Sequence, residues 1–126
     1  MLLKDIELPE LLPNQVLIKV KAASVNFPDL LMSQGKYQHK PELPFILGME
    51  GSGIIEDIGP QVTKFNRGDE VTFGSWGNGA FSNYVIAPEN GPELKSKELT
   101  FEEAASFQTA YLTAYVSLVR LSLIHI

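Results

Sequence analysis

The sequence VLIKVKAASVNFPD, residues 16–29, combines the pattern of a strand with the start of a helix. Apolar side chains occupy every second position of residues 16–22, with two lysines on the opposite face, which predicts a strand that is buried on one side. Asn26 then precedes a proline and an acid within three positions. A capping side chain and a favourable first turn therefore predict a short helix over residues 27–34 that ends at Gly35.

Short segments separated by turn residues follow this unit. A glycine cluster at residues 47–53 leads into two isoleucines, which predicts a strand with a close backbone approach or a bulge. A turn signal at residues 66–69 precedes a strand at 70–73, and a glycine-rich loop separates it from another strand at 80–87. Short strands with frequent turns predict a mainly β fold, either a barrel or a sandwich.

The pattern becomes helical near residue 99. Thr100 and Glu103 have the spacing of a capping box, and apolar residues then recur every three or four positions. One amphipathic helix is expected to fill the rest of the chain, joined to the β region by a polar loop at residues 88–97.

Composition excludes several classes of protein. The 126 residues suit one domain, and a net charge of −5 argues against a nucleic-acid partner, because nucleic-acid affinity comes mainly from basic surfaces. Without cysteine, disulfide frameworks and thiolate metal sites are ruled out. No run approaches the ~18 apolar residues of a membrane span and the first residues lack a signal-peptide pattern, so we expect a soluble cytoplasmic protein.

Two glycine clusters do not match nucleotide-binding motifs. Residues 48–53 and 74–79 both have GxxGxG spacing, whereas a dinucleotide fingerprint requires GxGxxG at the start of a helix. The signatures of serine hydrolases, zincins and P-loop proteins are also absent from the sequence. His39 and His125 cannot form a metal cluster on their own, so we expect no metal site.

Five motifs in a fixed order resemble those of medium-chain dehydrogenase/reductases of the zinc-independent quinone oxidoreductase branch. They are VLIKVKAASVNFPD at 16–29, QGKY at 34–37, LPF at 43–45, GMEGSG at 48–53 and RGDEV at 67–71. The resemblance covers about residues 13–120. It implies a mainly β, GroES-like, partly open β-barrel with a short helix, followed by a C-terminal helix towards a missing Rossmann domain. Zinc-dependent members have a histidine where Met49 stands and a cysteine upstream, so the chain resembles the metal-free type.

The resemblance also implies a two-domain enzyme that transfers hydride from NADPH to a quinone or another conjugated carbonyl. Without zinc, hydrogen-bond donors must stabilise the developing oxyanion, and the candidate catalytic residues are Asn26 and Tyr37. Asn26 and Thr113 are expected to bind the cofactor, and Tyr37 and Trp76 the substrate. Each has a structural alternative: helix capping for Asn26, covering loop aromatics for Tyr37 and Trp76, and a bond within its own helix for Thr113.

Three charged residues in these motifs have structural interpretations. Glu50 can organise the floor of the pocket, but a carboxylate between glycines more often accepts backbone N–H bonds or pairs with a distant arginine. We therefore expect a structural role for Glu50, and turn chemistry for Arg67 and Asp69.

The resemblance divides the chain into three parts. Residues 1–98 are the expected substrate-side domain, without its first strands, and residues 99–120 are the helix towards the missing nucleotide-binding domain. Residues 121–126, LSLIHI, can be encoded by a synthetic sequencing adapter, so a non-native tail is expected. The isolated chain is expected neither to bind NADPH tightly nor to reduce quinones, and to self-associate through the uncovered face of its helix.

Other functions stay open at this point. The GMEG motif also resembles the synaptic vesicle membrane protein branch of the superfamily, which implies a non-catalytic scaffold or membrane-associated protein. Enoyl-thioester reductases share these motifs too, and a stand-alone GroES-like module is disfavoured by the helix after Thr100. The choice between NADPH and NADH depends on ribose contacts outside this chain, and the longer parent can form a homodimer.

Overall fold

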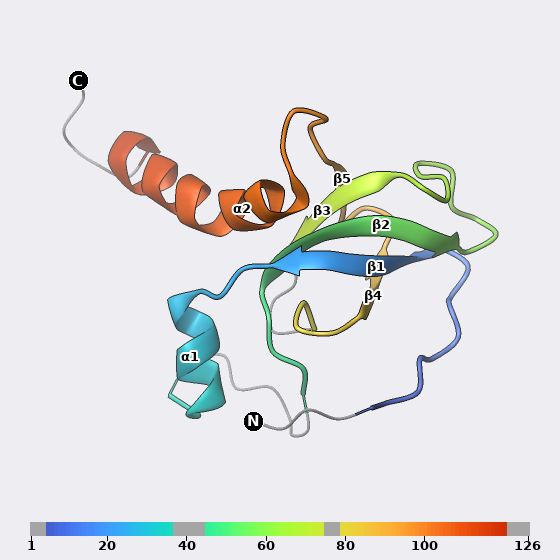
Figure 1. The fold of residues 1–126 in the computed structure, drawn as a ribbon, viewed down its shortest axis with the longest axis horizontal. Helices are drawn as coiled ribbons and strands as arrows, with labels where there is room; N and C mark the ends of the chain where they lie inside the picture. Colours follow the sequence, from blue (N-terminus) through green and yellow to red (C-terminus); the bar gives the residue numbers. More distant parts are fainter. Residues whose placement is uncertain (1–4, 37–44, 75–78, 121–126) are drawn as a thin grey trace.

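Figure 1 shows an antiparallel sheet with two helices attached to it. The computed structural model describes residues 5–36, 45–74 and 79–120. The five strands are β1 (Gln15–Ala23), β2 (Glu50–Ile58), β3 (Glu70–Gly74), β4 (Tyr84–Pro88) and β5 (Glu93–Leu94). The helices are α1 (Phe27–Ser33) and α2 (Phe101–Tyr115), and α2 continues as a π-helical segment at Val116–Arg120.

The strand order is β4-β1-β2-β3-β5, and the described strands do not close into a complete barrel. The first strand of the chain therefore lies inside the sheet, between β4 and β2. This mainly β, partly open architecture with few helices confirms the predicted fold class.

β1 supplies the centre of the hydrophobic core. Val16 and Ile18 are completely buried, and they pack in one cluster with Ile55 of β2 and Phe73 of β3. Lys19, on the opposite face, is exposed, as the alternating pattern predicts. A slip of one residue in the pairing would turn this lysine into the core, so burial of one face fixes the register.

Two glycines allow β1 and β2 to approach closely. A Cβ at Gly53 would overlap the carbonyl oxygen of Lys19, and one at Gly51 would lie 2.8 Å from the carbonyl oxygen of Ala22. The pairing is also irregular between Val20 and Ala22. The predicted close approach is thus confirmed, although β2 begins inside the glycine cluster instead of after it.

The last long strand is shorter than expected. The pattern predicted a strand over residues 80–87, but β4 begins only at Tyr84. Ser82 Oγ bonds to the carbonyl oxygens of Gly79, at 2.5 Å, and Tyr84, at 2.8 Å. A side chain that bonds to the nearby backbone on both sides stabilises a turn, so the prediction was wrong for residues 80–83.

Two further elements differ from the expectation. The polar loop at residues 88–97 contains the short strand β5, which pairs with β3, and beside it the Lys95 N–H donates to the Glu70 carbonyl at 2.9 Å. Two edge residues are too few to give an alternating pattern that sequence reasoning could detect. The single expected helix also becomes π-helical from Val116.

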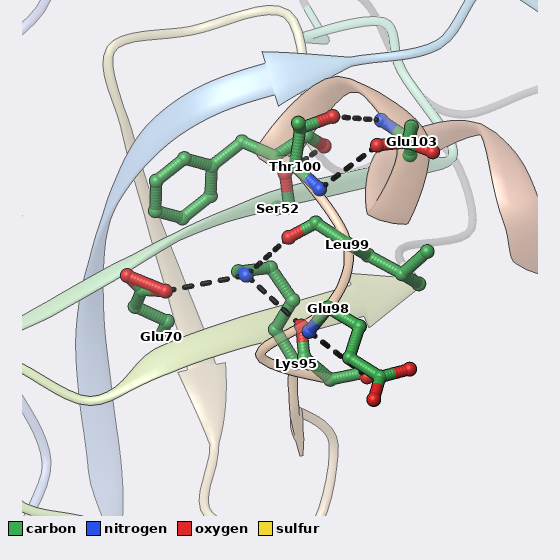
Figure 2. A network of polar contacts seen from close by, with 9 residues as sticks. Ser52, Glu70, Lys95, Glu98, Leu99, Thr100 and Glu103 are labelled. Atoms are coloured by element: carbon green, nitrogen blue, oxygen red, sulfur yellow. Dashed lines mark hydrogen bonds and ion pairs between the residues drawn. The ribbon is translucent and has the colours of Figure 1, made fainter.

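Figure 2 shows how the start of α2 is fixed to the sheet. The side chain of Lys95 is only 4% exposed, and its ammonium pairs with Glu70 Oε1 at 3.2 Å. The same ammonium donates to the carbonyl oxygen of Leu99 at 2.6 Å. Ser52, completely buried on β2, donates through Oγ to the carbonyl oxygen of Phe101 at 2.6 Å.

The predicted capping box at the start of α2 is confirmed. The Thr100 N–H donates to Glu103 Oε1 at 3.2 Å, and the Glu103 N–H donates to Thr100 Oγ1 at 3.1 Å (Figure 2). These two bonds satisfy N–H groups that a helix start otherwise leaves without partners.

Only the first turns of α2 pack on the sheet. Ala104 and Ala105 are buried, whereas Phe107, Tyr111 and Tyr115 are 47%, 58% and 45% exposed. From the sheet the helix extends outward, as Figure 1 shows. The apolar spacing therefore predicted a helix correctly, but the described structure covers only a small part of its apolar face. In the described ranges, no helix has the length and apolar character needed to cross a membrane.

Candidate active site

Three polar side chains meet where β1, α1 and β2 come together. Ser24 Oγ donates to Glu50 Oε1 at 2.6 Å. The side-chain nitrogen of Asn26 lies 3.1 Å from the same carboxylate oxygen and 3.2 Å from Ser24 Oγ. Glu50 is 2% exposed, whereas Ser24 and Asn26 are half-buried, so the cluster reaches the surface through the serine and the asparagine.

The strand register brings these residues together from distant parts of the sequence. Ser24 directly follows β1 and Glu50 is the first residue of β2, and the pairing of Ala23 with Gly51 sets the two side by side. The Ser24 N–H also donates to the Glu50 carbonyl at 3.4 Å. The close β1–β2 approach that the glycines permit is thus what places Glu50 beside Ser24 and Asn26.

Asn26 occupies the N-cap position of α1, as predicted, and forms a capping box with Asp29. The Asn26 N–H donates to Asp29 Oδ2 at 2.9 Å. Capping and the contacts with Glu50 therefore coexist at this residue, because they use different atoms of it.

Asp29 contributes a second buried carboxylate beside Asn26. It is 2% exposed, and its Oδ1 has no hydrogen-bond partner among the described residues. Buried carboxylate oxygens are almost always hydrogen-bonded, so this oxygen is unusual. The sequence identified Asp29 only as a favourable charge in the first turn of the helix.

The predicted site residues divide into three groups. Asn26 lies in the cluster, and Thr113 is exposed on the part of α2 beyond the buried alanines. Tyr37 and Trp76 lie outside the described residues. The structure therefore brings Asn26 together with Glu50, and the predicted cofactor and substrate roles stay predictions.

Sequence reasoning missed Ser24 and did not anticipate the donors to Glu50. Side chains of Ser24 and Asn26 donate to this carboxylate. One signal was available, since a serine directly after a strand and two residues before an N-cap is well placed to bond locally. The partner across the sheet could not be identified, because the register between β1 and β2 is not visible in the sequence.

Arg67 and Asp69 lie in the turn before β3. Asp69 Oδ2 accepts from the Asn66 N–H at 2.9 Å, which confirms the predicted turn chemistry. Arg67 instead pairs with Asp57 of β2 at 2.5 Å. The bond from Arg67, together with the Ile58 N–H, holds the pKa of the Asp57 carboxyl below its ordinary value.

Met49 precedes the cluster and belongs to an apolar environment. It is 7% exposed and packs with Met32 of α1 and with Leu47. Within the described part of the chain, no three histidine, cysteine, aspartate or glutamate side chains lie close enough together to hold a metal ion. Met49, which the resemblance aligns with the histidine of zinc-dependent members, therefore serves packing in this structure.

Residues 12–95 match the family described as the alcohol dehydrogenase GroES-like domain, which is more than half of the chain. The chain belongs to this family. Its GroES-like domain is similar to the quinone oxidoreductase of Lama guanicoe, with 36% identity over 114 residues that cover 90% of the chain and 34% of the relative. It is also similar to the synaptic vesicle membrane protein VAT-1 homolog of Rattus norvegicus, with 38% identity over 106 residues, 84% of the chain and 26% of the relative.

The fold of this GroES-like domain is also found in solved structures. Escherichia coli quinone oxidoreductase complexed with NADPH superposes with a TM-score of 0.81 and 29% identity, over 94% of this chain and 37% of that chain. The predicted family resemblance is confirmed. The chain spans only 26% to 37% of the length of these three proteins.

Proposed function

We propose that this chain is the substrate-side domain of an NADPH-dependent quinone oxidoreductase, which reduces a quinone or another conjugated carbonyl. The observation that carries the proposal is the half-buried Asn26 amide, held by buried Glu50 and by Ser24 in a domain similar to quinone oxidoreductases. A fixed amide donor is what a developing oxyanion needs when no metal polarises the carbonyl.

The residues of this chain fit one end of the cofactor. A half-buried amide suits the carboxamide and ring of a nicotinamide, and Asn26 would bind there, with Thr113 as a second candidate. NADPH, when bound, supplies the hydride. The sequence has no glycine fingerprint for a pyrophosphate, so we assign only the nicotinamide end to this chain.

The chain's own contribution is orientation and charge stabilisation. Buried Glu50 holds Asn26 from the side of the core. Tyr37 is proposed to donate to the substrate oxygen, and Trp76 is proposed to cover the substrate. Hydride transfer requires the reacting atoms to be about 3–3.5 Å apart, which one domain alone does not ensure. We therefore propose that the isolated chain binds NADPH weakly and does not reduce quinones.

Two experiments test this function. NADPH fluorescence titrated with the purified 126-residue chain should show no saturation at micromolar concentrations, and a low-micromolar Kd would contradict the proposal.

The coding sequence downstream of Arg120 should then be recovered and the longer protein assayed for NADPH oxidation with a quinone, an enone and an enoyl thioester. A folded longer protein that oxidises NADPH with none of these acceptors would exclude a reductase.

A second function is supported by the 38% identity to the VAT-1 homolog. In that case the domain is a non-catalytic scaffold of the same superfamily. The assay above separates the two functions, because a scaffold would not consume NADPH with any acceptor. A low ratio of enone to quinone turnover would separate a quinone reductase from the enone-reducing and enoyl-thioester-reducing alternatives.

We also propose a cytoplasmic location without a nucleic-acid partner. The net charge of −5 and the absence of cysteine support this proposal. Fractionation of the source cells, followed by detection of the native protein, tests the location. Recovery in a membrane fraction would favour the VAT-1-like alternative.

A further inference from the structure

The side chains of Ser24, Asn26 and Glu50 form a closed triangle of polar contacts. Its sides are 2.6 Å from Ser24 Oγ to Glu50 Oε1, 3.1 Å from Asn26 Nδ2 to Glu50 Oε1, and 3.2 Å from Asn26 Nδ2 to Ser24 Oγ. All three lengths are within hydrogen-bond range. The hydroxyl proton of Ser24 lies on the shortest side, so Ser24 Oγ donates to Glu50 and accepts from Asn26.

The two acceptors determine which end of the Asn26 amide faces the triangle. The oxygen and nitrogen of an asparagine side chain have nearly the same shape, so only their bonding partners distinguish them. A carboxylate oxygen accepts, and the serine hydroxyl has already given its one proton to that oxygen. Both neighbours therefore require the NH2 end, and the amide is held in one orientation.

One N–H of Asn26 stays outside the triangle. The three sides give an angle of about 50° at Asn26 Nδ2 between its two acceptors. The two N–H bonds of a planar amide diverge by about 120°, so one N–H placed between both acceptors makes straighter, stronger bonds than two N–H groups that each bend towards one acceptor. One N–H serves Glu50 and Ser24, and the other points away from them. Asn26 is half-buried, so part of this residue is open to solvent.

We propose that Glu50 is a positioning residue, which holds the Asn26 amide so that one N–H is directed outward as a donor to a carbonyl oxygen. The orientation itself follows from the triangle. Only the identity of the oxygen rests on the proposed function: either the developing oxyanion of the substrate or the carboxamide oxygen of the nicotinamide. Glu50 would act through Asn26 and would touch neither molecule.

Side-chain NMR on the 126-residue chain tests the orientation without any ligand. The chain contains six asparagines, so ¹⁵N-asparagine labelling gives a simple spectrum, and the Asn26 signals are those missing in Asn26→Ala. One Asn26 proton should exchange with solvent at least about ten times more slowly than those of exposed Asn66, and the other should exchange nearly as fast. Glu50→Gln should reduce this difference, because a neutral amide oxygen is a weaker hydrogen-bond acceptor than a carboxylate.

The matched control is Glu56→Gln, which changes an exposed carboxylate of the same strand and should leave the Asn26 signals unchanged. Equal, fast exchange of both Asn26 protons in the unmodified chain would overturn the proposal, and so would an unchanged pattern in folded Glu50→Gln. If Glu50→Gln does not fold, Ser24→Ala decides. It removes one corner of the triangle and should reduce the protection about threefold, and no reduction would count against the triangle.

Kinetics of the longer reductase test the functional part separately. Asn26→Ala should lower kcat about 100-fold and Glu50→Gln about 10-fold, and the double variant should be no worse than Asn26→Ala alone. Fully additive losses would overturn the positioning role. An unchanged KM for NADPH assigns the outward N–H to the substrate oxygen, whereas a raised KM assigns it to the nicotinamide. A longer protein without reductase activity would refute the proposed function and leave the NMR result standing.

Discussion

Both helices are fixed to the sheet by buried polar residues that lie two positions apart on β2. Glu50 accepts from the side chains of Ser24 and Asn26 at the start of α1. Ser52 donates to the carbonyl oxygen of Phe101 at the start of α2. We call these the α1 junction (Ser24, Asn26 and Glu50) and the α2 junction (Ser52, Glu70, Lys95 and residues 99–103).

The junctions differ in what their side chains bind. At the α2 junction, Ser52 and Lys95 both bind backbone carbonyls, which occur in every sequence and are fixed by the fold, and Lys95 also pairs with Glu70. At the α1 junction side chains bind side chains, and Asn26 is half-buried. The comparison indicates that the α2 junction serves stability, whereas the α1 junction positions one particular amide. Substitutions can test this division.

Gly53→Ala should have the largest effect, because it disturbs both junctions at once. The new Cβ would overlap the backbone of Lys19, so β1 and β2 would have to separate. We expect a loss of about 3 kcal/mol in the free energy of unfolding, measured by urea titration. The control is Gly91→Ala, where the new Cβ would lie 3.3 Å from the nearest atom, the Pro88 carbonyl oxygen. Equal losses in both variants would contradict the close-approach explanation.

Lys95→Met should disrupt the α2 junction alone. The change removes the ammonium from buried surroundings and leaves the Leu99 carbonyl without its 2.6 Å donor. We expect a loss of about 2 kcal/mol and faster hydrogen exchange in the first turns of α2, with the Asn26 side-chain signals unchanged. Lys97→Met, at an exposed lysine two residues away, is the control and should be close to neutral. A loss below about 0.5 kcal/mol would show that Lys95 does not fix the helix.

A pair of serine variants compares the junctions directly. Ser52→Ala removes a donor that is completely buried, and we expect it to cost about 1.5 kcal/mol. Ser24→Ala removes a half-buried donor that water can replace, and should cost about 0.5 kcal/mol. Urea titration of both variants gives the ranking. The reverse ranking would mean that the α1 junction contributes more to stability, against the division drawn above.

The sequence predicted those features that depend on neighbours along the chain. The alternation around Val16 and Ile18, the N-cap at Asn26 and the capping box of Thr100 with Glu103 are all local patterns, and all three are confirmed. The family resemblance was also identified correctly, because its motifs are short and ordered.

The contacts that build the two junctions could not be predicted. Ser24 meets Glu50 across 26 positions and Ser52 meets Phe101 across 49, and each contact depends on the register of β2. Lys95 looked like one charge in a polar loop, because nothing local shows that its side chain becomes buried. The local pattern gave a wrong prediction at residues 80–83. There the Ser82 side chain bonds to the backbone and stabilises a turn in place of the predicted strand.

Substitution of Asp57 is expected to have the smallest effect on stability. Asp57 forms an exposed ion pair with Arg67, unlike the buried contacts of the two junctions. The bond from Arg67 and the Ile58 N–H lower the pKa of Asp57 in the folded chain. Because the pKa of Asp57 is lower in the folded chain than in the unfolded chain, the ionised carboxylate stabilises the fold at any pH above the ordinary aspartate pKa. This stabilisation is lost as the pH falls through the pKa of Asp57 in the folded chain. The loss should therefore occur below about pH 4.

Asp57→Asn should be slightly less stable than the unmodified chain at pH 7 and equally stable near pH 2, as measured by urea titration at each pH. Since Asp57 and Arg67 are both exposed, 0.5 M salt should shrink the difference at pH 7, whereas the effect of Lys95→Met should persist in salt because that ammonium is buried. Equal salt sensitivity of the two variants would mean that salt screens the buried Lys95 contacts as strongly as the exposed Arg67–Asp57 ion pair. That result would contradict the distinction between the two.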